Sequence, residues 1–429
     1  MASKKVSGKM AREAAVVGHA FWGRPGGGQL VVAAAAKSFA DAGYRVVLAA
    51  VSRFDPRRYL DWYGIDLRGY PIVSSRFDIR LFGIYQRLLT YRYVERAMRR
   101  YNAGLVFIDE PFYKRLVARR SKGLRIIEYI HFPYEAVYDS RPGVLDELSR
   151  IGGGTTEYKY ISERYSGLMR VYWRTWVALA KMFRRGNPFS SADTVLTNSR
   201  WTASIIKKVY GEEPVVLNPP LPPQAFPGRE VPGFEDRGKT IVMLGRFSEE
   251  KRYHWVIENV LPRLLREEPE ARLVIIGGSR TRPSKAYIER LINLARRRSI
   301  SVERGGCTKA RLCLLENAPR PEINKVMDSS RVFLHATIGE HWGIAVAEAM
   351  ARGLPVVVHQ SGGAWTDLAG EGRYGVGYTT AEEAVEALVS LLNDEKKWHY
   401  YSGKGRERAE LLRMEVFGEK LLALVERIS

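Results

Sequence analysis

Short, almost uniformly apolar runs alternate along the chain with longer segments rich in helix-forming residues. Residues 13–20 (EAAVVGHA) and 44–50 (YRVVLAA) are of the first kind, and residues 29–43 (QLVVAAAAKSFADAG) between them are of the second. A parallel strand buried on both faces is apolar throughout, and a helix usually joins it to the next one, so this order predicts a strand–helix–strand unit. The glycine-rich residues 23–28 (GRPGGG) predict the turn between the first strand and the helix.

The same alternation continues through both halves of the chain. Residues 214–234 interrupt it with seven prolines between Pro214 and Pro232 and predict a linker. We therefore expect an α/β protein with two Rossmann-like domains, residues 1–218 and 219–405, and a helical segment, residues 406–429, that returns to the first domain. Further strands are expected at residues 103–109, 125–132, 194–198, 239–245, 272–278, 331–336 and 355–359.

The composition is that of a globular protein, with 45% hydrophobic and 27% charged residues. No apolar run approaches the ~20 residues that cross a bilayer, and the N-terminus lacks the apolar core of a secretion signal. We therefore expect a cytoplasmic protein. The two cysteines, Cys307 and Cys313, have no cluster at metal-ligand spacing around them, so we expect neither a disulfide framework nor a zinc site and interpret both thiols as incidental.

The net charge of +21 is concentrated in the first half of the chain. Residues 1–218 hold 36 lysines and arginines against 19 acidic residues, whereas residues 219–429 hold 32 against 28. A positive field of this kind favours polyanionic partners, namely nucleic acid, an anionic membrane surface or a phosphorylated substrate. A plain solvated surface rich in arginine is the alternative.

Two glutamates eight positions apart, Glu340 and Glu348, bracket small apolar residues in GEHWGIAVAEAM at 339–350. The stretch follows a predicted strand, and its glycines allow a turn into a helix from about residue 344 to residue 351. The N–H groups that open this helix form a seat for a phosphate. Because carboxylates repel phosphate, we expect the glutamates to accept hydrogen bonds from neutral hydroxyls such as those of a sugar. Alternatively, Glu348 is a solvated helix residue and Glu340 only complements the helix dipole.

Gly245, Arg246 and Lys251 lie in LGRFSEEKRYH, at the end of the strand predicted for residues 239–245. Open α/β sheets bind ligands at this carboxyl edge, and the two cations can reach one diphosphate from two sides. The stretch matches neither the GxxxxGK[ST] loop of nucleotide triphosphatases nor the GxGxxG turn of NAD sites. The alternative is a pair of surface cations at a helix start.

In combination, four motifs resemble the retaining glycosyltransferases of family 4: GRFSEEK at 245–251, IIGG at 275–278, GEHWGIAVAEAMARGLPVVV at 339–358 and SGG at 361–363. The resemblance implies the GT-B fold, in which two Rossmann-like parallel-sheet domains face a central cleft, and sugar transfer from a nucleotide-sugar donor without a further cofactor. Stretches such as IEYIHFPYE at 127–135 are most similar to the dolichol-pathway α-1,2-mannosyltransferase branch. That similarity implies GDP-mannose as donor, a glycan or lipid-diphosphate-linked acceptor, and peripheral attachment to the cytosolic face of a membrane. The N-terminal membrane anchor typical of the eukaryotic members is expected to be absent.

The resemblance assigns a role to each motif residue in the second half. Arg246 and Lys251, beside Gly245, would bind the donor diphosphate, Glu348 would bind the ribose hydroxyls, and Glu340 would bind the hydroxyls of the transferred sugar. Backbone N–H groups at the start of the helix would contact the phosphate or sugar, and these belong to Gly343, Ile344 and Ala345.

The first half contributes two candidates. His131, at the end of its predicted strand, is expected across the cleft near the anomeric carbon, with a structural histidine as the alternative. Gly27 and Gly28 have no side chains, so their backbone is expected to approach donor or acceptor closely; a tight turn is the alternative. No metal is expected, because the sequence has no D-x-D motif, and the adjacent Asp109 and Glu110 are interpreted as a strand end.

Residues 168–185 predict an amphipathic helix. Its basic and apolar faces suit an anionic membrane surface, although such an apolar face more simply packs into the core. The basic face holds Arg170, Arg174, Lys181, Arg184 and Arg185, and the apolar face holds Trp173, Trp176, Leu179 and Met182.

Two other functions stay open at this point. A basic nucleic-acid-binding protein fits the charge alone, but a helix-turn-helix or RNP1-like motif is missing, so no nucleic acid is expected as a partner. A sugar-nucleotide epimerase also pairs two such domains and would act on the donor alone.

Overall fold

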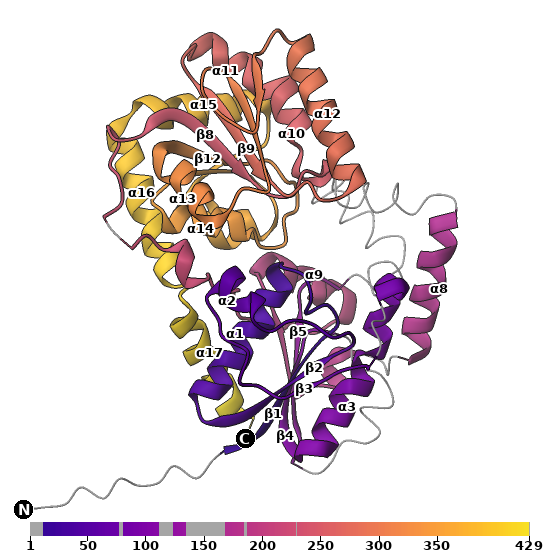
Figure 1. The fold of residues 1–429 in the computed structure, drawn as a ribbon. Helices are drawn as coiled ribbons and strands as arrows, with labels where there is room; N and C mark the ends of the chain where they lie inside the picture. The colour runs from indigo at the N-terminus through magenta and orange to yellow at the C-terminus, as the bar shows by residue number, and fades with distance from the viewer. Residues whose placement is uncertain are drawn as a thin grey trace, which may run out of the picture.

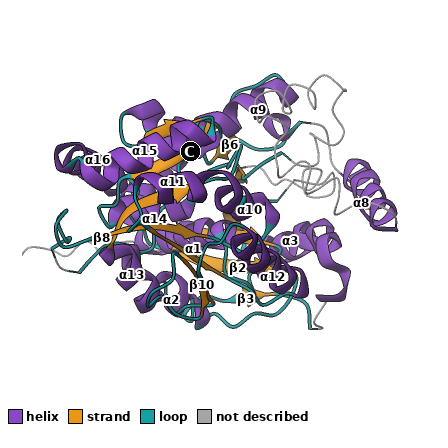
Figure 2. Cartoon of the chain, turned by 90° about the horizontal axis from the view of Figure 1, so that it is seen from above, coloured by secondary structure: helices purple, strands orange, loops and turns teal. Residues whose placement is uncertain are grey.

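The computed structural model describes residues 12–76, 80–110, 123–133, 168–183, 187–228 and 230–428. They form two α/β domains stacked one above the other, with the C-terminal helices running down one side from the second domain to the first (Figure 1). In each domain the strands lie in a layer between helices (Figure 2).

The first domain is built on a seven-stranded sheet in the order β3-β2-β1-β4-β5-β6-β7, with every pair parallel. Helices α1 (Gly27–Asp41) and α17 (Met414–Arg427) cover one face, and α3 (Thr90–Tyr101) and α8 (Leu168–Phe183) cover the other. Shorter helices α2 (Arg58–Tyr63) and α9 (Arg200–Tyr210) flank them. The strands are β1 (Arg12–His19), β2 (Tyr44–Ala50), β3 (Ile72–Val73), β4 (Ala103–Ile108), β5 (Arg125–Ile130), β6 (Thr194–Thr197) and β7 (Val215–Val216).

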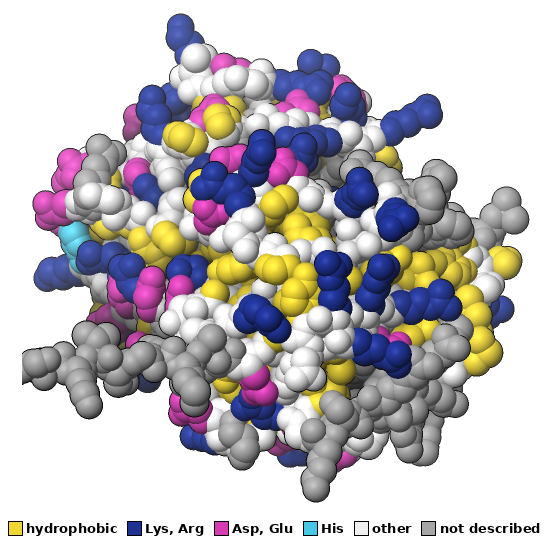
Figure 3. All heavy atoms as spheres, turned by 60° about the horizontal axis from the view of Figure 1, so that its bottom comes forward, with side chains coloured by type: hydrophobic (Ala, Val, Ile, Leu, Met, Phe, Trp, Pro, Cys, Tyr) yellow, Lys and Arg dark blue, Asp and Glu magenta, His cyan; other side chains and the backbone are white. Residues whose placement is uncertain are grey.

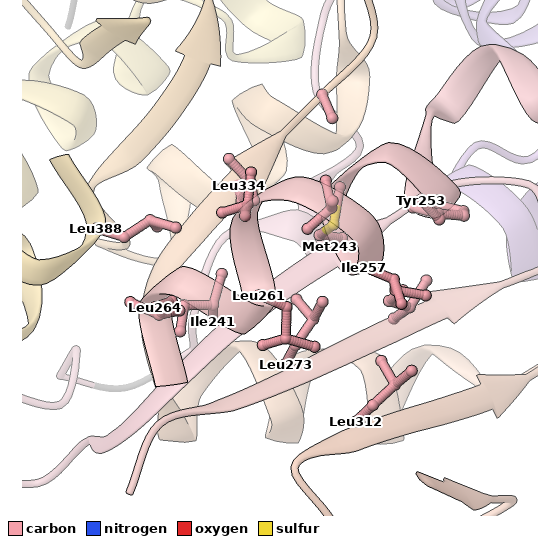
Figure 4. Close-up of a cluster of buried hydrophobic side chains, with 14 of the residues drawn as sticks. Ile241, Met243, Tyr253, Ile257, Leu261, Leu264, Leu273, Leu312, Leu334 and Leu388 are labelled. Atoms are coloured by element: carbon pink, nitrogen blue, oxygen red, sulfur yellow. The ribbon is translucent and has the colours of Figure 1, made fainter. Parts of the chain in front are cut away.

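The second domain repeats this plan with the strand order β10-β11-β9-β8-β12-β13-β14, again all parallel. One face is covered by α10 (Tyr253–Trp255), α11 (Leu261–Glu267), α12 (Arg282–Arg297) and α15 (Ala381–Asn393), whose apolar side chains share one core with those of the strands. Figure 4 shows side chains of α10, α11 and α15 in this core. The other face is covered by α13 (Arg320–Ser329), α14 (Ile344–Ala351) and α16 (Glu395–Glu410). The strands are β8 (Gly238–Leu244), β9 (Arg272–Gly277), β10 (Val302–Arg304), β11 (Leu312–Glu316), β12 (Ser330–His335), β13 (Val356–His359) and β14 (Val376–Tyr378).

These two parallel sheets confirm the predicted α/β class. The first helix is shifted from the predicted 29–43 to α1, because Gly26 is extended (φ 176°) and the helix begins directly after it. Glycines that looked like part of a turn are thus the first helical residues. This places Gly27 and Gly28 on the opening turn of α1, with their N–H groups outside the helical ladder.

The chain passes between the domains twice. After β7 the proline-rich segment leads to β8, and the backbone N–H of Leu221 donates to the carbonyl of Leu412 at 2.7 Å on the way. Later, α16 packs on α14 of the second domain, and α17 packs on α1 of the first, where Gly418 fits closely against Ser38. The two connections lie side by side and tie the domains together.

The prediction for the cysteines was wrong, because Cys307 and Cys313 form a disulfide with Cα atoms 5.3 Å apart. Cys307 lies in the loop that joins β10 to β11, and Cys313 lies on β11. Since the two strands are parallel neighbours, the loop must fold back along β11, which brings residues six positions apart within disulfide range. The spacing alone did not reveal this path.

Helix α8 buries one residue of its predicted apolar face and exposes another. Trp176 is fully buried in the core of the first domain, whereas Met182 on the same predicted face is 58% exposed and Val171 is 63% exposed. Arg184 and Arg185 lie outside the described residues, and nothing is described of the Arg170, Trp173 and Lys181 side chains. Among the helices that the structure describes, none has both the length and the apolar character needed to cross a bilayer.

We expect the disulfide to stabilise the second domain. A cross-link closing a loop this short is worth about 2 kcal/mol, because it restricts the unfolded chain. Denaturant unfolding should therefore show the wild type losing about that much free energy of unfolding on addition of a reductant. Cys307→Ser should lose a similar amount and should not respond to the reductant; a wild type that also ignores the reductant would contradict the expectation.

Candidate active site

The carboxyl ends of the two sheets meet where the domains touch. The Ser199 hydroxyl, at the start of α9, donates to the carbonyl of His341 at 2.8 Å, and the backbone N–H of Arg200 donates to Asp367 at 3.0 Å. The rings of Phe132 and His341 stack across the contact, with centroids 4.1 Å apart and planes 6° from parallel. Side chains at the strand ends of one domain therefore face those of the other.

Glu340, in the loop between β12 and α14, forms an ion pair with Lys251. Lys251 Nζ lies 2.6 Å from Glu340 Oε2, and His335 Nε2 at the end of β12 lies 3.2 Å from the same oxygen. Burial alone would raise the pKa of Glu340, but Lys251 and His335 outweigh it and hold the pKa well below its ordinary value. Glu340 is thus an ionised acceptor, and Lys251 is held beside it.

Glu348, on α14, is buried and meets a partner that the sequence analysis missed. Arg320, at the first position of α13, donates to both of its oxygens, at 3.0 and 2.9 Å. Such a two-pronged pair fixes the orientation of both side chains. Tyr63 of the first domain is close enough for its pKa to be influenced by both, although burial is the main reason why that pKa is raised to about 12. The interpretation of Glu348 as a solvated helix residue is therefore excluded.

The SGG stretch supports the loop that carries Glu340. Ser361 accepts a hydrogen bond from the N–H of Gly339 at 2.8 Å, and the N–H of Gly363 donates to the carbonyl of Glu340 at 2.7 Å. Gly362 has φ +76°, and a Cβ there would come within 2.2 Å of the Glu340 carbonyl oxygen. Only glycine fits, so the motif is explained by close backbone approach.

The phosphate seat predicted at α14 lies next to Glu340. Gly343 is left-handed (φ +100°) and precedes the helix, so the N–H groups of Ile344 and Ala345 open it without intrahelical acceptors. A Cβ on Gly343 would lie 3.6 Å from Glu340 Cγ. The helix terminus and Glu340 therefore border the same place.

The Arg246 side chain is more exposed than that of Lys251. Its side chain is 78% exposed and lies 3.1 Å from Glu250 Oε1. A Cβ on Gly245 would come within 3.4 Å of the Lys251 side chain and 2.9 Å of the Tyr253 hydroxyl, so glycine leaves room for Lys251 to lie across the strand end. The structure thus joins Lys251 to Glu340 and leaves the Arg246 side chain largely in solvent.

The glycine-rich loop of the first domain faces both domains. A Cβ on Gly27 would lie 3.0 Å from Ile344 Cδ1 of α14, and one on Gly28 would lie 3.2 Å from His131 Nε2. The Tyr63 hydroxyl fastens the loop, since it accepts from the Gly26 N–H at 2.6 Å and donates to the Gly26 carbonyl at 2.8 Å. The two predicted glycines are therefore brought next to the predicted helix terminus and the predicted histidine.

Three strand ends of the first domain come together at Asp109. His19 ends β1, Asp109 follows β4, and His131 follows β5. His19 Nδ1 lies 2.8 Å from one Asp109 oxygen, and His131 Nε2 lies 3.0 Å from the other. Burial favours the neutral acid, but the two histidines prevail and lower the Asp109 pKa below its ordinary range. The interpretation of Asp109 as no more than a strand end is therefore incomplete, because its carboxylate joins two histidines.

The neighbouring Glu110 raises the question of a metal. Ligand atoms of His19, Asp109 and Glu110 lie within 4.8 Å of one another, close enough together to hold a metal ion. However, both Asp109 oxygens already accept from histidines, and the Arg87 guanidinium contacts Glu110. A guanidinium repels a cation, so the arrangement favours a hydrogen-bonded network. Burial raises the Glu110 pKa to about 7 although Arg87 opposes it, which makes Glu110 a poorer metal ligand still.

Two nucleotide-binding patterns occur elsewhere in the chain, in the wrong context. Residues 233–240 (GFEDRGKT) match GxxxxGK[ST], and residues 370–375 (GEGRYG) match GxGxxG. Both patterns work only where a strand ends and a helix begins. Here the first leads into β8 and the second into β14, so neither forms a phosphate loop.

Comparison with known proteins identifies both domains. The family model described as Glycosyltransferase Family 4 matches residues 25–221, and the model described as Glycosyl transferases group 1 matches residues 228–408. The GDP-Man:Man(3)GlcNAc(2)-PP-Dol alpha-1,2-mannosyltransferase of Candida glabrata is 27% identical over 256 residues, which are 59% of this chain and 46% of that protein. The human enzyme of the same name is 28% identical over 188 residues, 42% of this chain and 36% of that protein. The matched stretches thus span less than half the length of these two relatives.

Solved structures match along almost the whole chain. HepE from Anabaena, in complex with UDP and glucose, has a TM-score of 0.63 at 17% identity and covers 97% of this chain and 100% of its own. A glycosyltransferase from Rickettsia africae has a TM-score of 0.67 at 13% identity and covers 98% of this chain and 99% of its own. At such identities the likeness is one of fold alone. A family 4 domain followed by a group 1 domain, in the two-domain arrangement of these neighbours, means that the chain belongs to the family 4 glycosyltransferases of the GT-B fold.

Proposed function

We propose that the protein is a retaining glycosyltransferase that moves mannose from GDP-mannose to a hydroxyl of a lipid-linked glycan. The observation that carries the proposal is the pairing of Lys251 with Glu340 beside the N-terminus of α14. This arrangement offers a cation and helix N–H groups for a diphosphate, and an ionised carboxylate for sugar hydroxyls. The choice of mannose, GDP and a lipid-linked acceptor is supported by the names of the curated relatives.

The proposed reaction develops negative charge on the departing diphosphate, and the cationic groups of the site would stabilise that charge. The acceptor hydroxyl oxygen bonds to the anomeric carbon from the face of the departing group, and the bond from that carbon to the diphosphate oxygen breaks, leaving its electron pair on the diphosphate. The proton of the acceptor hydroxyl passes to the diphosphate. Lys251, the α14 terminus and the exposed guanidinium of Arg246 stabilise the negative charge where it develops.

We also propose that transfer needs neither a metal nor a further cofactor, since the cationic groups already supply what a metal would supply to the diphosphate. Thermal shift with GDP-, UDP- and ADP-sugars in EDTA should show the largest stabilisation with GDP-mannose. Mannosyl transfer to a lipid-diphosphate-linked glycan should proceed in the same buffer. Stabilisation by another donor would correct the donor, dependence on added Mg²⁺ would overturn metal independence, and epimerised sugar formed from the donor alone would indicate an epimerase.

The two glutamates should fail in different ways when neutralised. Glu348→Gln leaves Arg320 without its charged partner and removes an acceptor for ribose hydroxyls, so we expect the Kd of GDP to rise about 10-fold or more. Glu340→Gln should leave the Kd of GDP within about 3-fold and lower kcat by about 100-fold, because its contact is to the transferred sugar. Calorimetry with GDP and initial-rate assays measure the two effects, and melting temperatures control for folding. Equal turnover of Glu340→Gln and the wild type would contradict the second expectation.

We propose that the first domain attaches to an anionic membrane through α3 and α8. Both helices pack on the segment Arg80–Leu89, and their inner residues share one core. Outward, α3 exposes four arginines on one helical face, and α8 exposes Val171 and Met182. With this end of the molecule brought forward, dark blue Lys and Arg side chains stand among yellow hydrophobic ones, the mixture that binds headgroups and enters the acyl boundary (Figure 3). The four arginines are Arg92, Arg96, Arg99 and Arg100.

Membrane attachment should depend on both parts of this surface. Val171→Ser/Met182→Ser should reduce co-sedimentation with phosphatidylserine-containing vesicles, and Arg92→Ser/Arg96→Ser should reduce it by about 10-fold or more at low salt. Neither pair should change the Kd of GDP. The matched control is Lys207→Ser/Lys208→Ser on α9, which removes the same charge elsewhere in the first domain. Equal loss in the control would mean that net charge alone attracts the protein, and no binding by the wild type would overturn the proposal.

A further inference from the structure

Asp109 lies between two histidines from different strands and engages both. Its Oδ1 lies 2.8 Å from His19 Nδ1, and its Oδ2 lies 3.0 Å from His131 Nε2. An ionised carboxylate has no proton to give, so both ring nitrogens donate to it. Asp109 therefore decides which nitrogen of each ring carries a proton.

Gln29, on the opening turn of α1, fixes the far side of His19. Its Nε2 donates to the carbonyl of Phe21 at 3.0 Å and lies 2.8 Å from His19 Nε2. An amide nitrogen only donates, so His19 Nε2 must accept. Neutral His19 is then confined to the form protonated on Nδ1, the atom that faces Asp109.

His131 is held from several sides while keeping access to the site. Its carbonyl accepts from Asn198 Nδ2 at 2.9 Å, and its ring packs against Tyr129 with centroids 4.9 Å apart. A Cβ on Gly28 would come within 3.2 Å of Nε2. Since Asp109 engages Nε2 and the side chain is 29% exposed, Nδ1 is the ring nitrogen left for a ligand.

We propose that Asp109 is a positioning residue for sugar transfer, holding His131 with its proton on Nε2 so that Nδ1 accepts a hydrogen bond from a hydroxyl of the bound sugar. This inference rests on the proposed function and adds to it a chain of contacts, Gln29 to His19 to Asp109 to His131, that fixes one tautomer. These four residues contribute no atom to the bond that forms between the acceptor and the sugar. It determines whether His131 accepts or donates.

Asp109→Asn tests the inference, because the direction of the new amide is dictated by Gln29. His19 Nδ1 must still donate, so the amide oxygen stays on the His19 side and the amide nitrogen faces His131. An amide nitrogen cannot accept, so the His131 proton moves to Nδ1, and the acceptor is lost. We expect kcat to fall on the order of 100-fold while the Kd of GDP stays within about 3-fold, since the nucleotide is proposed to bind in the second domain.

Two comparisons separate positioning from simple damage. His131→Ala should lower kcat as far as Asp109→Asn does, and the double variant should be no slower than His131→Ala alone, because residues acting as one unit are not additive. Glu110→Gln is the matched control, since it makes the same carboxyl-to-amide change at the adjacent buried residue, whose contact is Arg87 and not His131, and it should keep kcat within about 3-fold. Additive losses, or an equal loss in Glu110→Gln, would overturn the inference.

The tautomers themselves can be measured without any transfer. Imidazole ¹⁵N shifts of histidine-labelled protein should show His131 protonated on Nε2 and His19 on Nδ1 in the wild type, and His131 protonated on Nδ1 in Asp109→Asn. His131→Ala assigns its signal. A wild-type His131 protonated on Nδ1 would overturn the inference even if the variant fails to fold. Absence of mannosyl transfer by the wild type would instead refute the proposed function and leave this measurement to decide on the histidines.

Discussion

Parallel strand pairing is the constraint on which the site depends. All strands of a parallel sheet end at one edge, so residues far apart in sequence but last on their strands become neighbours. His19, Asp109 and His131 meet in this way in the first domain, and Gly245 and His335 do so in the second. Two such edges face each other because the chain passes twice between the domains and stacks Phe132 on His341. The fold thus brings the strand-end residues together, and their side chains determine the chemistry of the site.

Beside α14 in the second domain, two cationic side chains form ion pairs with the two motif glutamates. Lys251 is held by Glu340, and Arg320 by Glu348. A partly buried cation without a partner would lose solvation for nothing in return, so pairing stabilises the ionised form of both side chains. On the proposed function, the diphosphate binds Lys251 and the hydroxyls of the transferred sugar bind its partner Glu340. The phosphates and the sugar are then recognised side by side, by the two members of one ion pair.

The sequence predicted what depends on neighbours along the chain. Apolar runs predicted both sheets, and glycine spacing predicted the turn into α14 with Glu340 before it and Glu348 on it. These features are local, because strand burial and helix starts are decided within a few residues. The same reasoning selected Gly27, Gly28 and His131 as candidates. Gly28 and His131 come close because β1 and β5, on either side of β4, end at the same edge of the sheet.

What the sequence did not predict depends on partners distant in the chain or on a loop's path. Arg320 and Glu348 are 28 positions apart, and His19 and Asp109 are 90 apart, so no motif links them. Asp109 was tested only against the D-x-D spacing of metal sites and was therefore interpreted as a strand end. Its two oxygens acquire meaning only when three strands are in place, because a carboxylate between two imidazoles dictates where their protons lie. A residue whose role is to fix another residue's proton leaves its trace in the three-dimensional contacts and not in the sequence pattern.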